Sequence, residues 1–132
     1  MAPSLSRPFR PVELTEGTLD FFRLLEFAEE MKTEDEYRRS GLSGVTLARD
    51  EHLTLVLVAL RKGERMREHR APVGAAVVLL SGRASFVSGS DESRTELEPS
   101  CLAVFAPEVS HAVEALEDAV YLVIIGGRDR AA

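Results

Sequence analysis

The stretch of sequence that decides the fold runs from residue 63 to residue 82 and reads GERMREHRAPVGAAVVLLSG. It contains two runs with strand character, Met66 to His69 and Ala75 to Leu80. Pro72 and Gly74 stand between them, and both residue types favour turns. Short runs of this kind, bounded by turn residues, are typical of β-sandwiches and β-barrels.

The same pattern continues on both sides of this stretch. Further strand-like runs recur at intervals of about eight to twelve residues, as in sandwiches and barrels. They cover residues 45–48, 53–60, 83–88, 95–97, 101–105, 112–115 and 119–125. The sequence therefore predicts an all-β domain in its C-terminal two thirds.

The N-terminal part is different. Residues 1–17 contain three prolines and predict an irregular arm. Asp20 is a suitable N-cap for one amphipathic helix from Leu19 to Met31, and a second helical turn is expected over Glu34 to Arg39. The residues expected on the apolar face of the longer helix are Phe21, Leu24, Leu25 and Ala28.

Length and composition limit the classes of protein to consider. The 132 residues fit one domain, predicted over 18–132 with the barrel at about 45–125. A net charge of −6 argues against a nucleic acid or an anionic membrane as partner. With one cysteine the chain forms no intrachain disulfide, and residues 1–11 lack the apolar run of a secretory signal. We expect a cytoplasmic protein.

The run LTLVLVAL at residues 53–60 is apolar on nearly both faces. In an antiparallel sheet such a strand must be covered on both sides, because an exposed apolar strand promotes aggregation. Either the predicted helix or a second subunit can provide the cover. We predict a homodimer with this strand and the N-terminal segment at the interface.

The region from residue 45 to residue 125 resembles the cupin superfamily. The first cupin motif is a Gly, five residues, His-x-His, three or four residues, a Glu, six residues and a Gly. Gly63, His69 and Gly82 keep this frame, whereas Ala71 and Ala75 stand where the second His and the Glu are expected.

The second cupin motif is similar to residues 99–111. Pro107 and His111 match it, and Val109 replaces its glycine. The resemblance implies a cupin barrel (a double-stranded β-helix, or jelly roll) with an N-terminal helical segment. The fold hosts dioxygenases, isomerases, sugar-binding sensors and storage proteins, so it does not specify a function.

The resemblance also implies where a site would lie. Three His and one Glu bind a divalent metal ion inside the intact cupin barrel, and here His69 and His111 are the ligands that remain. Known zinc and iron sites use three protein ligands, and an alanine methyl group cannot be one. We therefore predict that His69 and His111 line the barrel and bind a small organic ligand, with a divalent metal completed by water as the alternative.

Three other groups of residues are weighed as sites. His52 stands in a polar turn beside Glu51, which predicts a solvated loop residue. Cys101 begins an apolar strand, which predicts a buried structural thiol. Four arginines flank the first motif and predict either a solvated strand face or an anion-binding barrel mouth: Arg65, Arg67, Arg70 and Arg83.

Three functions follow from these expectations. The first is a binding module, because an apolar pocket with two imidazoles suits recognition of a small organic molecule. The second is a metal-dependent oxygenase or isomerase. The third is metal-free acid–base catalysis by His69 and His111, since histidine titrates near neutral pH.

Overall fold

The computed structural model describes residues 9–69, 72–89 and 93–126. Within these residues it contains two helices and ten strands. The helices are α1 (Leu24–Met31) and α2 (Asp35–Ser40). The strands are β1 (Val12–Glu13), β2 (Leu42–Arg49), β3 (Thr54–Leu60), β4 (Arg65–His69), β5 (Ala75–Ser81), β6 (Ala84–Ser88), β7 (Ser93–Leu97), β8 (Leu102–Phe105), β9 (His111–Ala115) and β10 (Ala119–Ile125).

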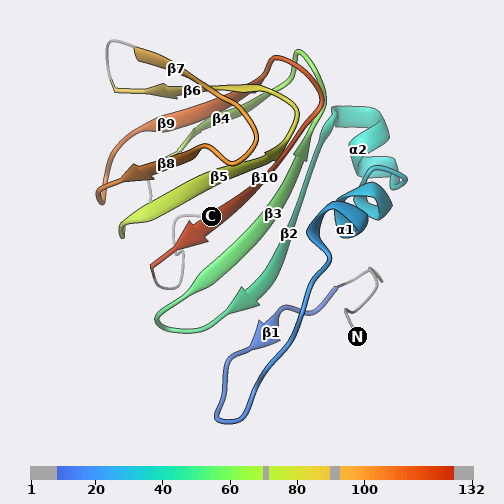
Figure 1. The fold of residues 1–132 in the computed structure, drawn as a ribbon, viewed down its shortest axis with the longest axis vertical. Coiled ribbons are helices and arrows are strands. Elements are labelled where there is room, and N and C mark those ends of the chain that lie inside the picture. Colours follow the sequence, from blue (N-terminus) through green and yellow to red (C-terminus); the bar gives the residue numbers. More distant parts are fainter. Residues whose placement is uncertain (1–8, 70–71, 90–92, 127–132) are drawn as a thin grey trace.

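The strands of the described residues form two sheets that face each other (Figure 1). The larger sheet has the order β1-β2-β3-β10-β5-β8, and the smaller sheet has the order β4-β9-β6-β7. The pairs are antiparallel except β1 with β2, and most neighbours in a sheet are distant in sequence. The predicted all-β barrel with an N-terminal helical segment is confirmed.

Strand alternation places the barrel core between the sheets. On β5, Ala75, Val77 and Leu79 are buried, as expected for side chains two residues apart that share one face. They pack with residues from the other strands, among them the fully buried Val113 and Tyr121. The interior is therefore lined almost entirely by apolar side chains.

A second core lies on the outer face of the larger sheet, beneath the helices. Phe27, Ala28 and Met31 of α1 are buried there and pack with Leu57 and Ala59 of β3. Val58 and Leu60, the alternate residues of β3, belong to the barrel core. The chain's own helix thus covers part of the doubly apolar strand, which was one of the two expected solutions.

The predicted start of α1 was wrong. The helix begins at Leu24 with Arg23 at its N-cap, whereas Leu19 was expected as its start and Asp20 as its cap. Phe22 lies before the helix and packs edge-on against the rings of Phe9 and Phe27, with centroid distances of 6.3 and 5.9 Å. The contact with Phe9 of the N-terminal arm holds Phe22 outside the helix. Helical periodicity in the sequence does not reveal an aromatic partner that is distant along the chain.

The expected apolar face of α1 was wrong in two positions. Phe21, which lies before the helix, and Leu25 are 62% and 49% exposed, and Phe27, Ala28 and Met31 are the buried residues of α1. The helical turn after it was predicted within one residue. Gly41 ends α2 in the left-handed conformation at φ 73°, where glycine is favoured, and Gly44 lies inside β2. The expected strand at residues 45–48 is accordingly longer, starting at Leu42.

None of the helices in the described residues is both long enough and apolar enough to cross a membrane.

Candidate functional site

The two candidate histidines meet at the end of the smaller sheet. In the backbone register of β4 and β9, His69 pairs with His111, and on the other side of β9 His111 pairs with Ser88 of β6. A bulge between Met66 and His69 shifts the register of β4 just before this point. Residues from opposite ends of the expected site, 42 positions apart, are therefore cross-strand neighbours.

His111 is buried in the barrel, with 3% of its surface exposed. Its imidazole ring stacks parallel to the ring of Phe86, at a centroid distance of 5.6 Å and an interplanar angle of 5°. The ring of Phe105 is tilted against the imidazole, with a centroid distance of 4.3 Å, and its centroid lies 5.6 Å from that of Phe86. The imidazole therefore packs in a cluster of three rings with Phe86 of β6 and Phe105 of β8.

A hydrogen bond fixes the orientation of this imidazole. Nδ1 of His111 lies 3.1 Å from the backbone carbonyl oxygen of Val109. Because a carbonyl oxygen only accepts, Nδ1 carries the proton in this bond, and in the neutral ring Nε2 then has the lone pair. Metal-binding and catalytic histidines are commonly oriented in this way by a carbonyl group.

The turn before His111 adopts an uncommon backbone conformation. Glu108 has a φ of 66°, in the left-handed region that non-glycine residues rarely occupy. Glu108 follows Pro107 and precedes Val109, whose carbonyl accepts the hydrogen bond from His111. A strained residue of this kind persists only where its surroundings determine the conformation, and such residues cluster at functional sites.

The residues that the structure describes do not make up a complete metal site. They contain no group of three or more His, Cys, Asp and Glu side chains placed to hold an ion. Ala75, at the position of the expected glutamate, is buried and presents a methyl group. Ala71 lies outside the described residues, as does the side chain of His69. The donor set on β5 and β9 thus differs from the three-ligand sites of zinc and iron enzymes.

Three aromatic residues of the barrel interior were not among the predicted site residues. Phe86 and Phe105 contact His111, and Tyr121 is fully buried on β10, where its hydroxyl group donates a hydrogen bond to Sδ of Met66 at 3.1 Å. Burial raises the pKa of Tyr121 far above its ordinary value, so the phenol stays protonated. Strand alternation could have predicted that these side chains point into the barrel.

The structure places His52 as predicted and Cys101 differently. His52 is exposed in the turn before β3, 3.8 Å from the carboxylate of Glu51. Cys101, expected to be buried, is exposed. It lies in a turn before β8 begins, where its N–H bonds to the carbonyl of Glu98 and the preceding Ser100 has a φ of 73°. The predicted strand over residues 101–105 therefore began one residue too early, because β8 starts at Leu102.

The arginines near the first motif lie mostly on the solvated surface. Arg65 and Arg67 are exposed. Arg83 forms an ion pair with Glu96 of β7. Arg70 lies outside the described residues. For the three described arginines the structure agrees with the solvated strand face.

Comparisons with known proteins identify the fold. No protein-family model and no curated protein matches the sequence. Solved structures do match. An RmlC-like cupin from Desulfovibrio desulfuricans is 17% identical, with a TM-score of 0.62 over 86% of this chain and 95% of that one. A conserved Streptococcus pyogenes protein of unknown function is 23% identical, with a TM-score of 0.61 over 69% of this chain and 78% of that one.

An enzyme is also among the matches. Salicylate 1,2-dioxygenase from Pseudoaminobacter salicylatoxidans is 12% identical, with a TM-score of 0.69 over 80% of this chain and 34% of the much longer enzyme. At these identities the comparisons establish the fold and leave the activity open. Together with the strand order of the two sheets, they show that the chain has the cupin-superfamily fold, a double-stranded β-helix barrel.

Proposed function

We propose that the chain binds a small organic molecule inside the barrel, next to His111 and His69. The observation that carries this proposal is the imidazole of His111, which is buried against the rings of Phe86 and Phe105 and oriented by the carbonyl of Val109. Ligand pockets are typically apolar and aromatic, with a few fixed polar groups that orient the ligand. The end of the barrel at His111 has this character.

The residues around His111 also indicate the kind of ligand. Phenylalanine rings favour flat or apolar groups, which they contact by stacking or edge-on packing. Imidazole nitrogens form hydrogen bonds with hydroxyl and carboxyl groups. We therefore expect a small molecule with an apolar, preferably aromatic, body and one polar substituent.

The test is a binding screen on the purified chain. Small phenols, aromatic acids and sugars are tested by thermal shift, and binders are confirmed by calorimetry. We expect an aromatic compound to raise the melting temperature, and the His111→Asn substitution to weaken its binding at least tenfold, which is about 1.4 kcal/mol. His52→Asn is the matched control, because that histidine is exposed in a turn far along the chain from the barrel site. A binder that His111→Asn leaves unaffected contradicts the proposal.

A second candidate function is metal-dependent catalysis of the oxygenase or isomerase type. One observation favours it: the backbone register brings His69, a residue of a metal-binding type, opposite His111. Elemental analysis of untagged protein tests this candidate. It requires about one metal ion per chain, lost in both the His69→Ala and His111→Ala variants. Protein without metal, which also takes none up on titration, excludes it.

A further inference from the structure

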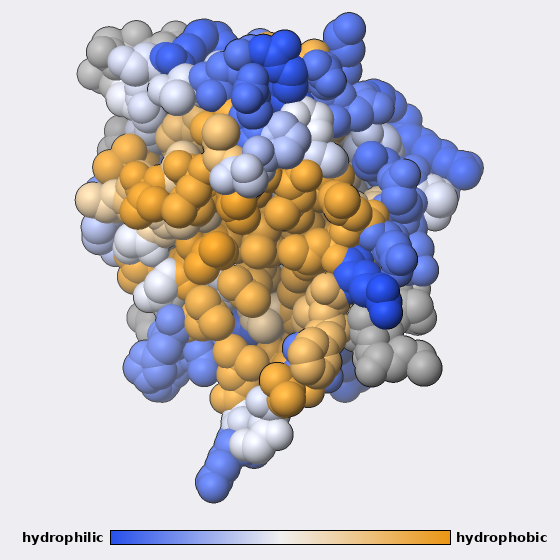
Figure 2. Space-filling model, in the orientation of Figure 1, coloured by the Kyte–Doolittle hydropathy of each residue, from blue (hydrophilic) through white to orange (hydrophobic). Residues whose placement is uncertain are grey.

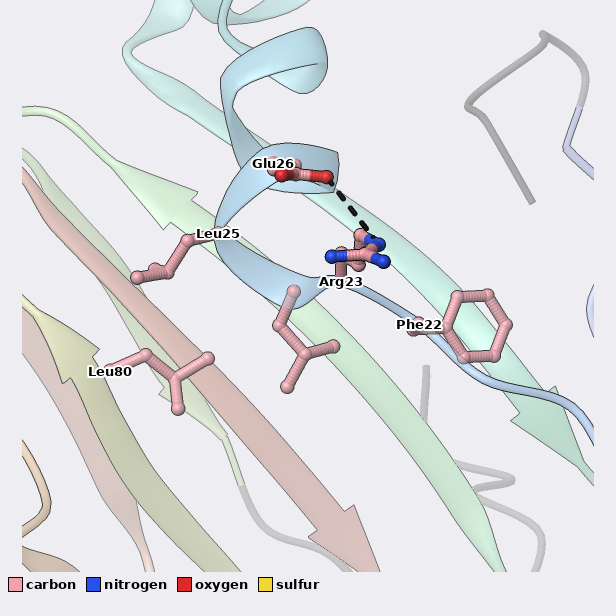
Figure 3. A pocket seen from close by; sticks show the side chains of 6 residues that line it. Phe22, Arg23, Leu25, Glu26 and Leu80 are labelled. Carbon is pink, nitrogen blue, oxygen red and sulfur yellow. Dashed lines mark ion pairs between the residues drawn. The ribbon is translucent and has the colours of Figure 1, made fainter. Parts of the chain in front are cut away.

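The outer face of the larger sheet offers a ligand few polar groups. Figure 2 shows a broad apolar surface over β10, β5 and β8, and an open groove of about 440 Å³ lies between α1 and β5. Phe22 and Leu25 line one side of this groove, and Leu80 lines the other (Figure 3). Its two charged side chains, Arg23 and Glu26, lie 4.0 Å apart and compensate each other's charge. The inner face of the same sheet is different.

The side chains of the inner face form rows that cross the strands, because residues paired in register share one face of a sheet. One row joins five strands and consists of Arg49 on β2, Thr54 on β3, Ile125 on β10, Ala75 on β5 and Phe105 on β8. At the β8 end of this row, Phe105 contacts His111. At the β2 end, the row finishes with Arg49. The row therefore leads from the candidate site to a guanidinium group.

A β-bulge places Arg49 on the inner face. Val45 and Leu47 of β2 belong to the outer core beneath the helices, so simple alternation would place Arg49 on the outer face as well. The register of β2 with β3 shifts between Thr46 and Ala48, and Arg49 then lies opposite Thr54, which is 2% exposed inside the barrel. Bulges are common next to functional sites, where they redirect a side chain. The bulge in β2 redirects a cation.

The charge of Arg49 is not used by the chain itself. Arg49 is exposed and makes no ion pair with any carboxylate that the structure describes. Glu13 of β1 is its cross-strand neighbour but does not pair with it. The carboxylate of Asp50, the next residue along the chain, accepts hydrogen bonds from the N–H groups of His52 and Leu53. A guanidinium group binds a carboxylate through two parallel hydrogen bonds, so Arg49 suits an acid.

The inner face next to Arg49 is apolar and partly open. Val56 of β3 and Val123 of β10 pair in the neighbouring row and pack against the barrel core, yet both are only partly buried. Thr46 of β2 lies in register with Val56 and is also partly exposed. Gly44 is exposed on the same face, and a Cβ atom added there would meet no described atom within 4 Å. An apolar ligand body therefore has room on Val56 and Val123.

We propose that Arg49 binds the carboxylate of an elongated aromatic acid whose body lies on Val56 and Val123. The ring of the acid points along the row toward Phe105 and His111, and its carboxylate points toward β2. This inference rests on the proposed function, because it extends the same ligand site from His111 across the inner face. It narrows the ligand to an aryl carboxylic acid with a short chain between the ring and the acid group.

Calorimetric titration of the full chain with 3-phenylpropionate and with its neutral amide, 3-phenylpropionamide, tests the role of Arg49. We expect the acid to bind about tenfold more tightly than the amide, because hydrogen bonds to a charged group are stronger than neutral ones. Arg49→Gln should remove this preference. Arg67→Gln is the matched control and should keep it, because Arg67 is exposed on β4 and alternates with Met66, which packs against the barrel core.

A second pair of variants tests the apolar wall without changing any charge. Thr46→Phe adds a ring over Val56 and should weaken binding of both compounds about tenfold, because the ring occupies the place of the ligand body. Thr46→Val keeps the size of the side chain and should bind both compounds as the wild type does. Far-UV circular dichroism and thermal unfolding establish that each variant is folded before its affinity is interpreted.

The His111→Asn variant separates this inference from the proposed function. Binding that His111→Asn weakens, while Arg49→Gln and Thr46→Phe leave it unchanged, overturns the role of Arg49 and keeps the site at His111. Binding of the acid that depends on Arg49 and not on His111 supports the carboxylate site and overturns the proposed function. A wild-type chain that binds neither compound at millimolar concentration overturns both.

Discussion

The outer faces of the two sheets differ sharply. On the smaller sheet, β7 exposes Arg94 and Glu96, and Arg94 pairs with Glu114 of β9 at 3.3 Å. On the larger sheet, β8 exposes Leu102 and Val104. Both faces belong to the same barrel and have the same strand geometry. The outer face of the smaller sheet is thus polar on β7 and faces water, whereas α1 covers one part of the larger sheet and β8 exposes apolar side chains.

The largest effect on this comparison should come from removing the packing under α1. Leu57 is fully buried between β3 and the helix although it is on the outer face of the barrel. Leu57→Ala should lower the free energy of unfolding by about 3 kcal/mol, because it removes buried methyl groups and leaves a cavity. Urea denaturation measures this change. Thr95→Ala at an exposed position of β7 is the control. Equal small losses of stability for both variants would mean that the packing of α1 on Leu57 contributes little to stability.

The turns that join the two sheets should give an intermediate effect. Gly82 connects β5 to β6 at a φ of 82°, and a Cβ atom there would lie 2.0 Å from the carbonyl oxygen of Asp118. Gly82→Ala should therefore destabilise the chain by about 2 kcal/mol or more, from backbone strain and the clash together.

Gly63, in the turn between β3 and β4, provides the matched control. Its φ is 87°, and an added Cβ would meet no described atom within 4 Å. Gly63→Ala should cost only the backbone strain of about 1 kcal/mol. Thermal unfolding of the two variants separates these contributions, and a Gly63→Ala loss as large as that of Gly82→Ala would show that the contact with Asp118 contributes nothing.

The smallest effect is expected on the polar face of the smaller sheet. The ion pair between Arg94 and Glu114 is half exposed. Arg94→Ala should change the free energy of unfolding by less than about 1 kcal/mol, because water and salt screen such pairs. Denaturation at low and high salt measures it. A larger loss of unfolding free energy that persists at high salt would indicate that Arg94 makes packing contacts in addition to the ion pair.

The candidate site shows how far the sequence could lead. The spacing of the first motif identified His69, and the second motif identified His111, although half of the expected ligand positions hold other residues. The packing of His111 against Phe86 and Phe105 was not predicted, because these rings come from different strands and meet only in the folded barrel. The exposure of Cys101 was also missed, since turn and strand residues look alike at the start of a short apolar run.

The sequence by itself determined the all-β class, the positions of most strands, the helical turn before β2 and the resemblance to cupins. These are local properties, because side-chain alternation and turn preferences act over a few neighbouring residues. Only the tertiary structure decided which sheet face is covered, where α1 begins and which rings contact His111. These depend on contacts between residues far apart in the chain, such as Phe9 with Phe22 or Phe105 with His111, and such contacts exist only once the strand register is formed.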